Sequence, residues 1–450
     1  MTSFTDQFFS TPALCEVMGD DALLRHMAEF EAALAGVQGR LGIIPADAAA
    51  LIAGAARAMS FHRPDLFADA RKAGTLAIPL VKALTAEVRR ADPGAAAFVH
   101  VGATSQDVID TAMMLQLRGA LALIRADGRR LAEAAARLAR DHRASLMLGR
   151  TLLQPATPVT FGLKAAQWLV GALDALAAVD HHAALAVRLQ FGGAAGNLGS
   201  LAGNGPAVAL EMARELFPGT EPALLPWHTR RGALASFAGA LAVLTGVCGK
   251  IARDVTLMMQ SEVAEAFEGA EAGRGGSSAM PHKQNPVRSM QILANAARAP
   301  FLAATIMAGL AQEHERGLGG WQAEWAVLPD LVRISGGAAA LGADLLETLR
   351  VDPARMRANF DALRGLPLTE AAALALSHTL GRDGAHAAVE AAARGVVASG
   401  RTLSEVLKGD KTLACHLSAA EIDALSDPAN ALGATQGMID GALALLAGKG

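Results

Sequence analysis

The stretch Gly273–Val287, which reads GRGGSSAMPHKQNPV, concentrates side chains that could do chemistry. Ser277 and Ser278 carry hydroxyls that could serve as a nucleophile or a base, and Lys283 carries a positive charge. Glycine gives a loop conformational freedom at little steric cost. The residue types therefore allow a mobile polar loop that supplies a proton-transfer group and a cation.

The end of this stretch has the pattern of a helix start. Asn285 and Pro286 are typical of an N-cap and of the first helical position. The N-terminus of a helix favours an anion, because its amide groups and dipole point toward it. Two interpretations follow from the residues: a loop that binds an anionic substrate, or a flexible surface loop with an ordinary cap.

A second polar stretch, Phe98–Thr111, reads FVHVGATSQDVIDT. Thr104 and Asp107 have the spacing of a helix capping box. The same crowding of polar groups at a helix N-terminus would also suit a carboxylate. Taken alone, this stretch favours a cap.

Both stretches resemble conserved regions of the fumarase/aspartase superfamily. The first resembles the signature GSSxMPxKxNP, which is matched at Gly276, Ser277, Ser278, Met280, Pro281, Lys283, Asn285 and Pro286. The second resembles HxGxTSxD, which is matched at His100, Gly102, Thr104, Ser105 and Asp107. The resemblance implies addition or elimination next to a carboxylate, through an aci-carboxylate that needs cations and hydrogen bonds.

A third region departs from the pattern GRTHxQ of adenylosuccinate-type lyases. Arg150, Thr151 and Gln154 match it, but Leu152 stands where those lyases have a catalytic histidine. In this respect the chain resembles a cycloisomerase branch of the superfamily. Lactonisation fits such a change, because a carboxylate leaving group needs no protonation near neutral pH. We interpret Leu152 as a residue that shapes the site without taking part in the chemistry.

The resemblance implies roles for individual residues. Proton transfer falls to Ser278 or to Lys283, and the choice between them stays open. Substrate binding falls to His100, Thr104, Ser105, Gln106, Arg150, Thr151, Gln154, Ser277, Asn285 and Arg316. The expected substrate is a small tricarboxylate, with no metal and no organic cofactor. The segment from Gly273 to Lys283 is expected to close over it.

The resemblance also implies an all-α fold of three domains. These are an N-terminal domain (1–111), a central domain (112–350) and a C-terminal domain (351–450). The central five-helix bundles of four subunits would form a 20-helix core, so that active sites are shared between subunits.

Apolar spacing in the chain itself predicts long helices with no strand-like alternation. Asp20–Leu41 carries apolar residues at helical spacing, and Thr157–Pro158 has the pattern of a helix start. The five long central helices are expected at about 112–142, 157–187, 231–267, 285–315 and 322–349. Leu189–Gly205 is rich in glycine and is expected to be a loop.

Composition limits the other functional classes. Hydrophobic residues make up 52% of the 450 residues, but the uncharged run Ala233–Gly249 is shorter than the ~20 apolar residues that span a bilayer. We therefore expect no membrane partner. The net charge of −3, without a basic run, argues against nucleic-acid binding. The N-terminus lacks a secretory pattern and the three cysteines are far apart, so a cytoplasmic location is expected.

Two alternatives belong to other functional classes. The chain could be another lyase of the superfamily, such as an adenylosuccinate lyase, and Leu152 argues against this. It could instead be a non-catalytic structural member, and the intact set of Ser278, Lys283 and Asn285 argues against that.

Overall fold

The computed structural model describes residues 3–448, apart from 270–274, 277–279 and 281–282. The described chain is predominantly α-helical, which confirms the predicted all-α class. It divides into two compact units, each made of segments that are distant in sequence. The first unit holds 1–128, 175–249 and 291–340, and the second holds 129–174, 250–290 and 341–450. The division into three domains stays a prediction.

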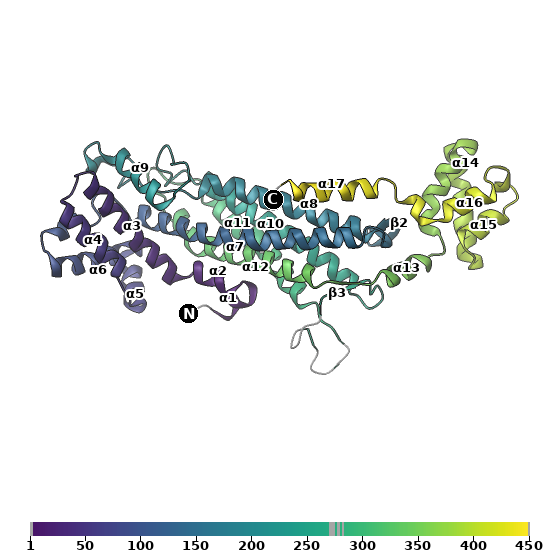
Figure 1. Ribbon diagram of the computed structural model, residues 1–450, viewed down its shortest axis with the longest axis horizontal. Helices are drawn as coiled ribbons and strands as arrows, with labels where there is room; N and C mark the ends of the chain where they lie inside the picture. The colour runs from purple at the N-terminus through teal and green to yellow at the C-terminus, as the bar shows by residue number, and fades with distance from the viewer. Residues whose placement is uncertain (1–2, 270–274, 277–279, 281–282, 449–450) are drawn as a thin grey trace. The chain divides into compact units, whose positions relative to one another are not determined.

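The first unit begins with short helices that pack on α3. Along α3, residues Leu24, Met27, Phe30, Leu34 and Val37 recur every three or four positions and are at most 1% exposed, as the helical spacing predicts. In Figure 1, α3, α4 and α6 lie together. The helices of this part are α1 (Phe4–Phe9), α2 (Pro12–Val17), α3 (Asp20–Arg40), α4 (Ala46–Ala58), α5 (Arg63–Ala73) and α6 (Ala77–Ala91).

Five long helices follow, with lengths of 22 to 37 residues. They are α7 (Ser105–Asp141), α8 (Phe161–Ala186), α10 (Gly232–Met258), α11 (Val287–Ala308) and α12 (Gly320–Glu347). The five predicted long helices are thus present, although their ends differ from the prediction. The expected loop at Leu189–Gly205 is confirmed, with one 3₁₀ turn (Gly199–Leu201) before α9 (Gly205–Leu216).

The start predicted for the second long helix is wrong. Thr157 and Pro158 lie in a strand, β2 (Gln154–Thr160), which pairs antiparallel with β1 (Leu146–Thr151). A residue before proline favours extended backbone, so this pair fits a strand as well as a helix start. The helix begins three residues later, where the Thr160 hydroxyl accepts a hydrogen bond from the Leu163 amide at 3.1 Å.

The ends of α10 and α11 also differ from the prediction. α10 ends at Met258, and the segment predicted as its last turns includes β3 (Ala266–Phe267), which pairs with β4 (Arg350–Val351). α11 begins at Val287, and the Pro286 carbonyl accepts a hydrogen bond from the Met290 amide at 2.9 Å. The capping position therefore falls on Pro286, one residue after the predicted Asn285.

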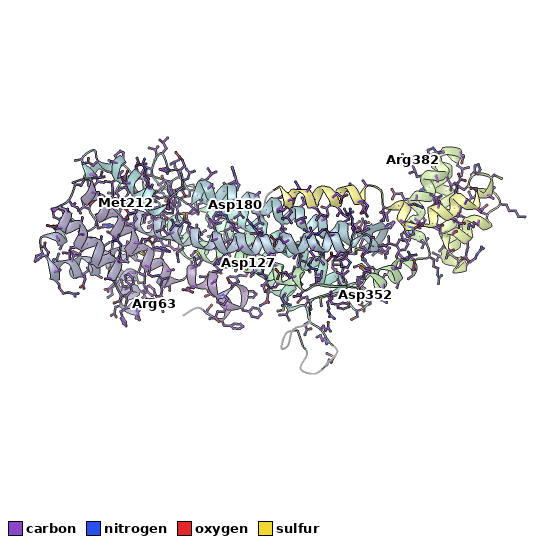
Figure 2. The ribbon with its side chains drawn as sticks, viewed as in Figure 1. Arg63, Asp127, Asp180, Met212, Asp352 and Arg382 are labelled. Carbon is purple, nitrogen blue, oxygen red and sulfur yellow. The ribbon has the colours of Figure 1, made fainter. Side chains whose placement is uncertain are left out.

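Within the described residues, the C-terminal part of the second unit consists of five α-helices, of which α13, α15 and α16 have a side-chain N-cap. Asp352, labelled in Figure 2, caps α13 by accepting from the Arg355 amide at 2.9 Å. Gly381, with a φ of 69°, has non-helical backbone and breaks α14 into two helices. The helices are α13 (Pro353–Asp361), α14 (Thr369–Ser399), α15 (Leu403–Gly409), α16 (Ala419–Ser426) and α17 (Thr435–Ala447).

Within the described residues, α8, α10 and α12 are long and apolar enough to cross a membrane by length and composition alone. This corrects the expectation based on Ala233–Gly249, because α10 continues through Met258 and spans 27 residues. In α10 and α12, 56% and 67% of the most apolar window is buried inside the protein.

Candidate active site

His100 lies in the loop before α7, and Glu31 of α3 holds its ring. His100 Nδ1 is 2.6 Å from Glu31 Oε1, and the Glu31 side chain is only 1% exposed. Burial alone would lower the pKa of His100, but the Glu31 charge and hydrogen bond outweigh it, so that the pKa is raised. The pair therefore favours an imidazolium cation, with Nε2 as the nitrogen left for a ligand.

Asp107, in the first turn of α7, fastens the glycine-rich loop to this helix. Its fully buried carboxylate accepts hydrogen bonds from the amides of Thr104, Gly192 and Gly193 and from Gln190 Nε2, at 2.9–3.1 Å. Burial raises the pKa of Asp107 to about 6, although these hydrogen bonds oppose the rise. The predicted capping contact with Thr104 is present, but three of the four donors come from elsewhere.

Arg316 contacts the same glycine-rich loop. Its Nη1 donates to Gln106 Oε1 at 2.7 Å, Nε donates to the Ala194 carbonyl at 3.2 Å, and Nη2 donates to the Gly193 carbonyl. Burial lowers the pKa of Arg316, and the charges of Asp107 and Asp110 oppose this. These three acceptors are neutral, so the guanidinium keeps a charge that could attract a carboxylate.

The structure thus brings together several residues that the sequence analysis assigned to the substrate. Gln106 contacts Arg316, and Ser105, the first residue of α7, lines a cavity of about 430 Å³ together with His100. Thr104 precedes Ser105 and is half-buried. All five lie in the first unit. Their roles toward a substrate stay predictions.

A buried charge network lies beside these residues, and sequence reasoning missed it. Arg231, 1% exposed, donates to Asp110 Oδ2 at 2.7 Å and to the Glu324 carboxylate. Trp321 Nε1 donates to Asp110 Oδ1 at 2.9 Å, and Gln106 Nε2 donates to Asp110 Oδ2 at 3.2 Å. Asp110 therefore holds the side chain of Gln106 in place. In the sequence, only the position of Asp110, one helical turn after Gln106, hinted at this contact.

The second unit carries the region in which leucine replaces histidine. Leu152 and Leu153 form the two-residue tip of the β1–β2 hairpin, with φ values of 50° and 65° and exposures of 97% and 72%. Such a tip normally takes Asn or Gly, because left-handed backbone strains other residues. Thr151 and Gln154 flank the tip as paired strand residues. The structure thus places left-handed backbone and high exposure together at this tip, and the role of the tip toward a substrate stays a prediction.

Arg150, predicted to bind substrate, is engaged by the chain itself. Its Nη1 and Nη2 donate to Glu265 Oε2 and Oε1 at 2.8 and 2.7 Å, in a bidentate pair. Glu265 is fully buried, and Asn359 Nδ2 donates to its Oε1 at 2.8 Å. The geometry gives Arg150 a structural partner; binding of substrate by Arg150 stays a prediction.

The two ends of the signature loop are joined at its base. Gly276 and Gln284 form an antiparallel bridge, and the Asn285 amide donates to the Gly275 carbonyl at 2.8 Å. Lys283 is exposed at this point, and Asn285 is half-buried. Ser277 and Ser278 lie outside the described residues, so their predicted roles stay predictions.

The N-terminus of α11 holds a carboxylate of the chain itself. The Glu268 carboxylate accepts from the amides of Arg288 and Ser289 at 3.1 and 2.8 Å, and from Ser289 Oγ at 2.6 Å. Glu268 is 6% exposed. The amides that were predicted to bind a substrate anion therefore already donate to Glu268.

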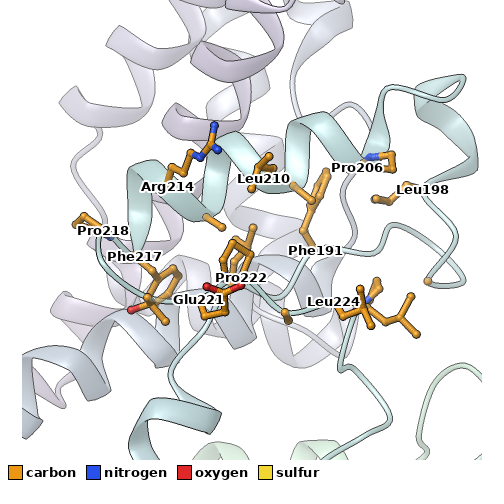
Figure 3. Close-up of a pocket in the computed structure, with 18 of the residues that line it drawn as sticks. Phe191, Leu198, Pro206, Leu210, Arg214, Phe217, Pro218, Glu221, Pro222 and Leu224 are labelled. Carbon is orange, nitrogen blue, oxygen red and sulfur yellow. The ribbon is translucent and has the colours of Figure 1, made fainter.

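Another cavity, shown in Figure 3, lies between α9 and the segment 217–226. Its volume is about 980 Å³, and Phe191, Leu210, Phe217 and Pro222 are among the residues that line it. Among the predicted site residues that the structure describes, none lines this cavity. Within the described ranges, there is also no cluster of three or more His, Cys, Asp or Glu that could hold a metal.

Comparison with known proteins identifies the class. The lyase family matches residues 1–300, and the family described as adenylosuccinate lyase C-terminus matches residues 365–442. The chain belongs to the lyase family and is an enzyme of the fumarase/aspartase superfamily.

Individual relatives are more specific. A 3-carboxy-cis,cis-muconate cycloisomerase of Bradyrhizobium diazoefficiens is 49% identical, over 96% of this chain and 95% of the relative. A nitrosuccinate lyase of Streptomyces davaonensis is 44% identical, over 95% of this chain and 91% of the relative. The crystal structure of the 3-carboxy-cis,cis-muconate lactonizing enzyme from Pseudomonas putida superposes with a TM-score of 0.92 at 39% identity, covering 99% of both chains.

Proposed function

We propose that this enzyme interconverts 3-carboxy-cis,cis-muconate and 4-carboxymuconolactone, a step of protocatechuate breakdown in the β-ketoadipate pathway. The observation that carries the proposal is similarity over nearly the whole length to a cycloisomerase of 49% identity and to a lactonizing enzyme of TM-score 0.92. The leucine at position 152 supports it, because this reaction needs no acid for its leaving group.

The reaction requires one new C–O bond and one proton transfer. A carboxylate oxygen of the substrate attacks a carbon of the double bond conjugated to another carboxyl group, and the α-carbon takes up a proton. In reverse, a base removes that proton and the carboxylate leaves. We assign the proton transfer to Ser278 or Lys283, and charge stabilisation to cations around the intermediate. Arg316 supports this assignment, because it lies beside Gln106 with neutral partners.

The strongest rival is cleavage of a substrate such as nitrosuccinate, because a nitrosuccinate lyase is 44% identical to this chain. An adenylosuccinate-type reaction is less favoured, because Leu152 cannot protonate a nitrogen leaving group. A non-catalytic role is disfavoured by the presence of Ser278, Lys283 and Asn285.

Parallel kinetics with both substrates separate the two activities. Purified enzyme should show a far higher kcat/KM for 3-carboxy-cis,cis-muconate, followed by loss of its conjugated-diene absorbance, than for nitrosuccinate, followed by release of nitrite. A clear preference for nitrosuccinate would replace the proposed function with the rival.

The proposed assembly is a cytoplasmic homotetramer with active sites shared between subunits and with neither a membrane nor a nucleic acid as partner. Its physical motivation is the apolar surface on the long helices: Leu185, Val243, Phe301 and Met307 are between 45% and 76% exposed in the single chain. Light scattering should give four times the mass of the chain, and a well-behaved active monomer would contradict the assembly.

Sharing of sites has its own test. Mixed tetramers of Ser278→Ala and His100→Ala should recover part of the wild-type activity if these residues meet across subunits. No recovery in mixed tetramers of verified composition would show that each site lies within one chain.

A further inference from the structure

The cavity beside His100 and Ser105 has a second wall, which none of the conserved stretches includes. This wall is α6, which contributes Val81, Lys82 and Arg89 to the lining. The volume of about 430 Å³ lies in the range of small-ligand sites. All of these residues belong to the first unit, so the cavity is complete within it.

The spacing of the two cations puts them on one side of α6. Lys82 and Arg89 are seven residues apart, which is about two helical turns and about 10 Å along the axis. Thr85, between them, also lines the cavity. Arg90, their neighbour, is not part of the lining and instead pairs with Glu87 at 2.7 Å. Lys82 and Arg89 therefore line the cavity, whereas Arg90 lies outside the lining and is already paired.

Charge in the cavity favours an anion. Its lining includes Lys82, Arg89 and His100, and contains no Asp or Glu. His100 itself favours the protonated form beside Glu31. The carboxylate of Glu31 pairs with His100 but is not part of the lining, so among the described lining residues no carboxylate competes with an anion for Lys82 and Arg89.

The proposed substrate needs more cationic contacts than the conserved stretches provide. It carries three carboxylates, whereas the Arg150 guanidinium is already bound by Glu265 and the N-terminus of α11 by Glu268. Arg316, Lys283 and the protonated His100 are then the cations of the predicted site whose groups are left for the substrate.

We propose that Lys82 and Arg89 form a carboxylate subsite that, with His100 and Ser105, holds one carboxylate of the tricarboxylate and makes the enzyme prefer three carboxylates over two. The identity of the substrate rests on the proposed function; the preference for a third carboxylate can be measured without turnover.

Exposed side chains make the subsite testable without unfolding the protein. The variants are Lys82→Ala, Arg89→Ala and the double variant, with Arg90→Ala as the matched control on the same helix. Lys82→Arg and Arg89→Lys keep the charge and should largely restore function. Each is measured by steady-state kinetics with 3-carboxy-cis,cis-muconate, and by calorimetric titration with tricarballylate and with glutarate, which share a five-carbon backbone but carry three and two carboxylates.

The double variant should raise KM for 3-carboxy-cis,cis-muconate roughly tenfold or more, with kcat within about twofold, because a binding contact is lost and the chemistry is not. Its affinity for tricarballylate should fall by a similar factor, and its affinity for glutarate should change little. Added salt should weaken tricarballylate binding in the wild type more than in the double variant.

Several results would overturn the subsite. These are an unchanged KM, an equal loss in Arg90→Ala, a loss of kcat at constant KM, or wild-type enzyme that binds tricarballylate no better than glutarate. A wild type that fails to convert 3-carboxy-cis,cis-muconate, but loses its tricarballylate preference in the double variant, would refute the proposed function and leave the subsite standing.

Discussion

Replacement of Arg150 by alanine distinguishes a substrate ligand from a structural partner. In this variant the Glu265 carboxylate, which is fully buried, loses both hydrogen bonds from Arg150 and keeps the one from Asn359 Nδ2. Removal of one member of a buried ion pair typically costs about 3–5 kcal/mol. The Arg150 side chain is 27% exposed, so water can replace part of the lost contact, and we expect the lower end of that range, about 3 kcal/mol.

The measurement is urea unfolding followed by circular dichroism, at one protein concentration because subunit assembly would contribute to stability. Arg143→Ala is the control, since Arg143 pairs with the exposed Asp440 at 2.8 Å and its loss should cost about 1 kcal/mol or less. The double variant Arg150→Ala/Glu265→Gln should be more stable than Arg150→Ala, because the uncompensated charge is gone.

The kinetic result completes the test. If Arg150 acts mainly through Glu265, the residual folded variant should keep a KM within a few-fold of wild type. A loss of stability below about 0.5 kcal/mol combined with a KM increase of tenfold or more would refute this reasoning and make Arg150 a substrate ligand.

Three further predictions concern the proposed chemistry. Lowering the pH from about 7.5 to about 5.5 should raise the wild-type KM, because Asp107 has its pKa raised to about 6 and becomes protonated. The protonated carboxyl group can no longer accept all four hydrogen bonds. Asp107→Asn should have a raised KM that does not change further over this pH range. Ser278→Ala should lower kcat by about 10²–10⁴-fold with KM within a few-fold, and a near-normal kcat would transfer the proton role to Lys283. Leu152→Ala should mainly change KM, since the side chain is 97% exposed at the hairpin tip, and a loss of kcat by orders of magnitude would show that the tip takes part in the chemistry.

Local patterns were sufficient to predict α3 and the presence of the five long helices, but neither the exact ends of those helices nor the hairpin. The apolar spacing in α3 predicts its buried face, because this spacing depends only on neighbours along the chain. The β1–β2 hairpin escaped prediction because its tip is Leu152–Leu153, where hairpin tips usually carry Asn or Gly. Its second strand also contains the Thr157–Pro158 pair, whose sequence fits either a helix start or an extended strand.

The partners of the site residues could not be read from the sequence for a different reason. Arg150 and Glu265 are 115 residues apart, and Asp107 meets a loop more than 80 residues away. Motif resemblance pointed to Arg150 but not to Glu265, whose carboxylate pairs with it. The same holds for Glu268, whose carboxylate accepts hydrogen bonds from the N-terminal amides of α11 that were predicted to bind a substrate.

The central claim is the lactonisation itself. The most direct measurement is incubation of purified enzyme with 3-carboxy-cis,cis-muconate in deuterated water, with absorbance followed continuously and the product identified by NMR. The proposed function predicts loss of the diene absorbance, formation of 4-carboxymuconolactone and one deuterium at its α-carbon, all strongly reduced in Ser278→Ala. Unchanged absorbance with active, folded enzyme, or a product that lacks the lactone ring, would contradict it.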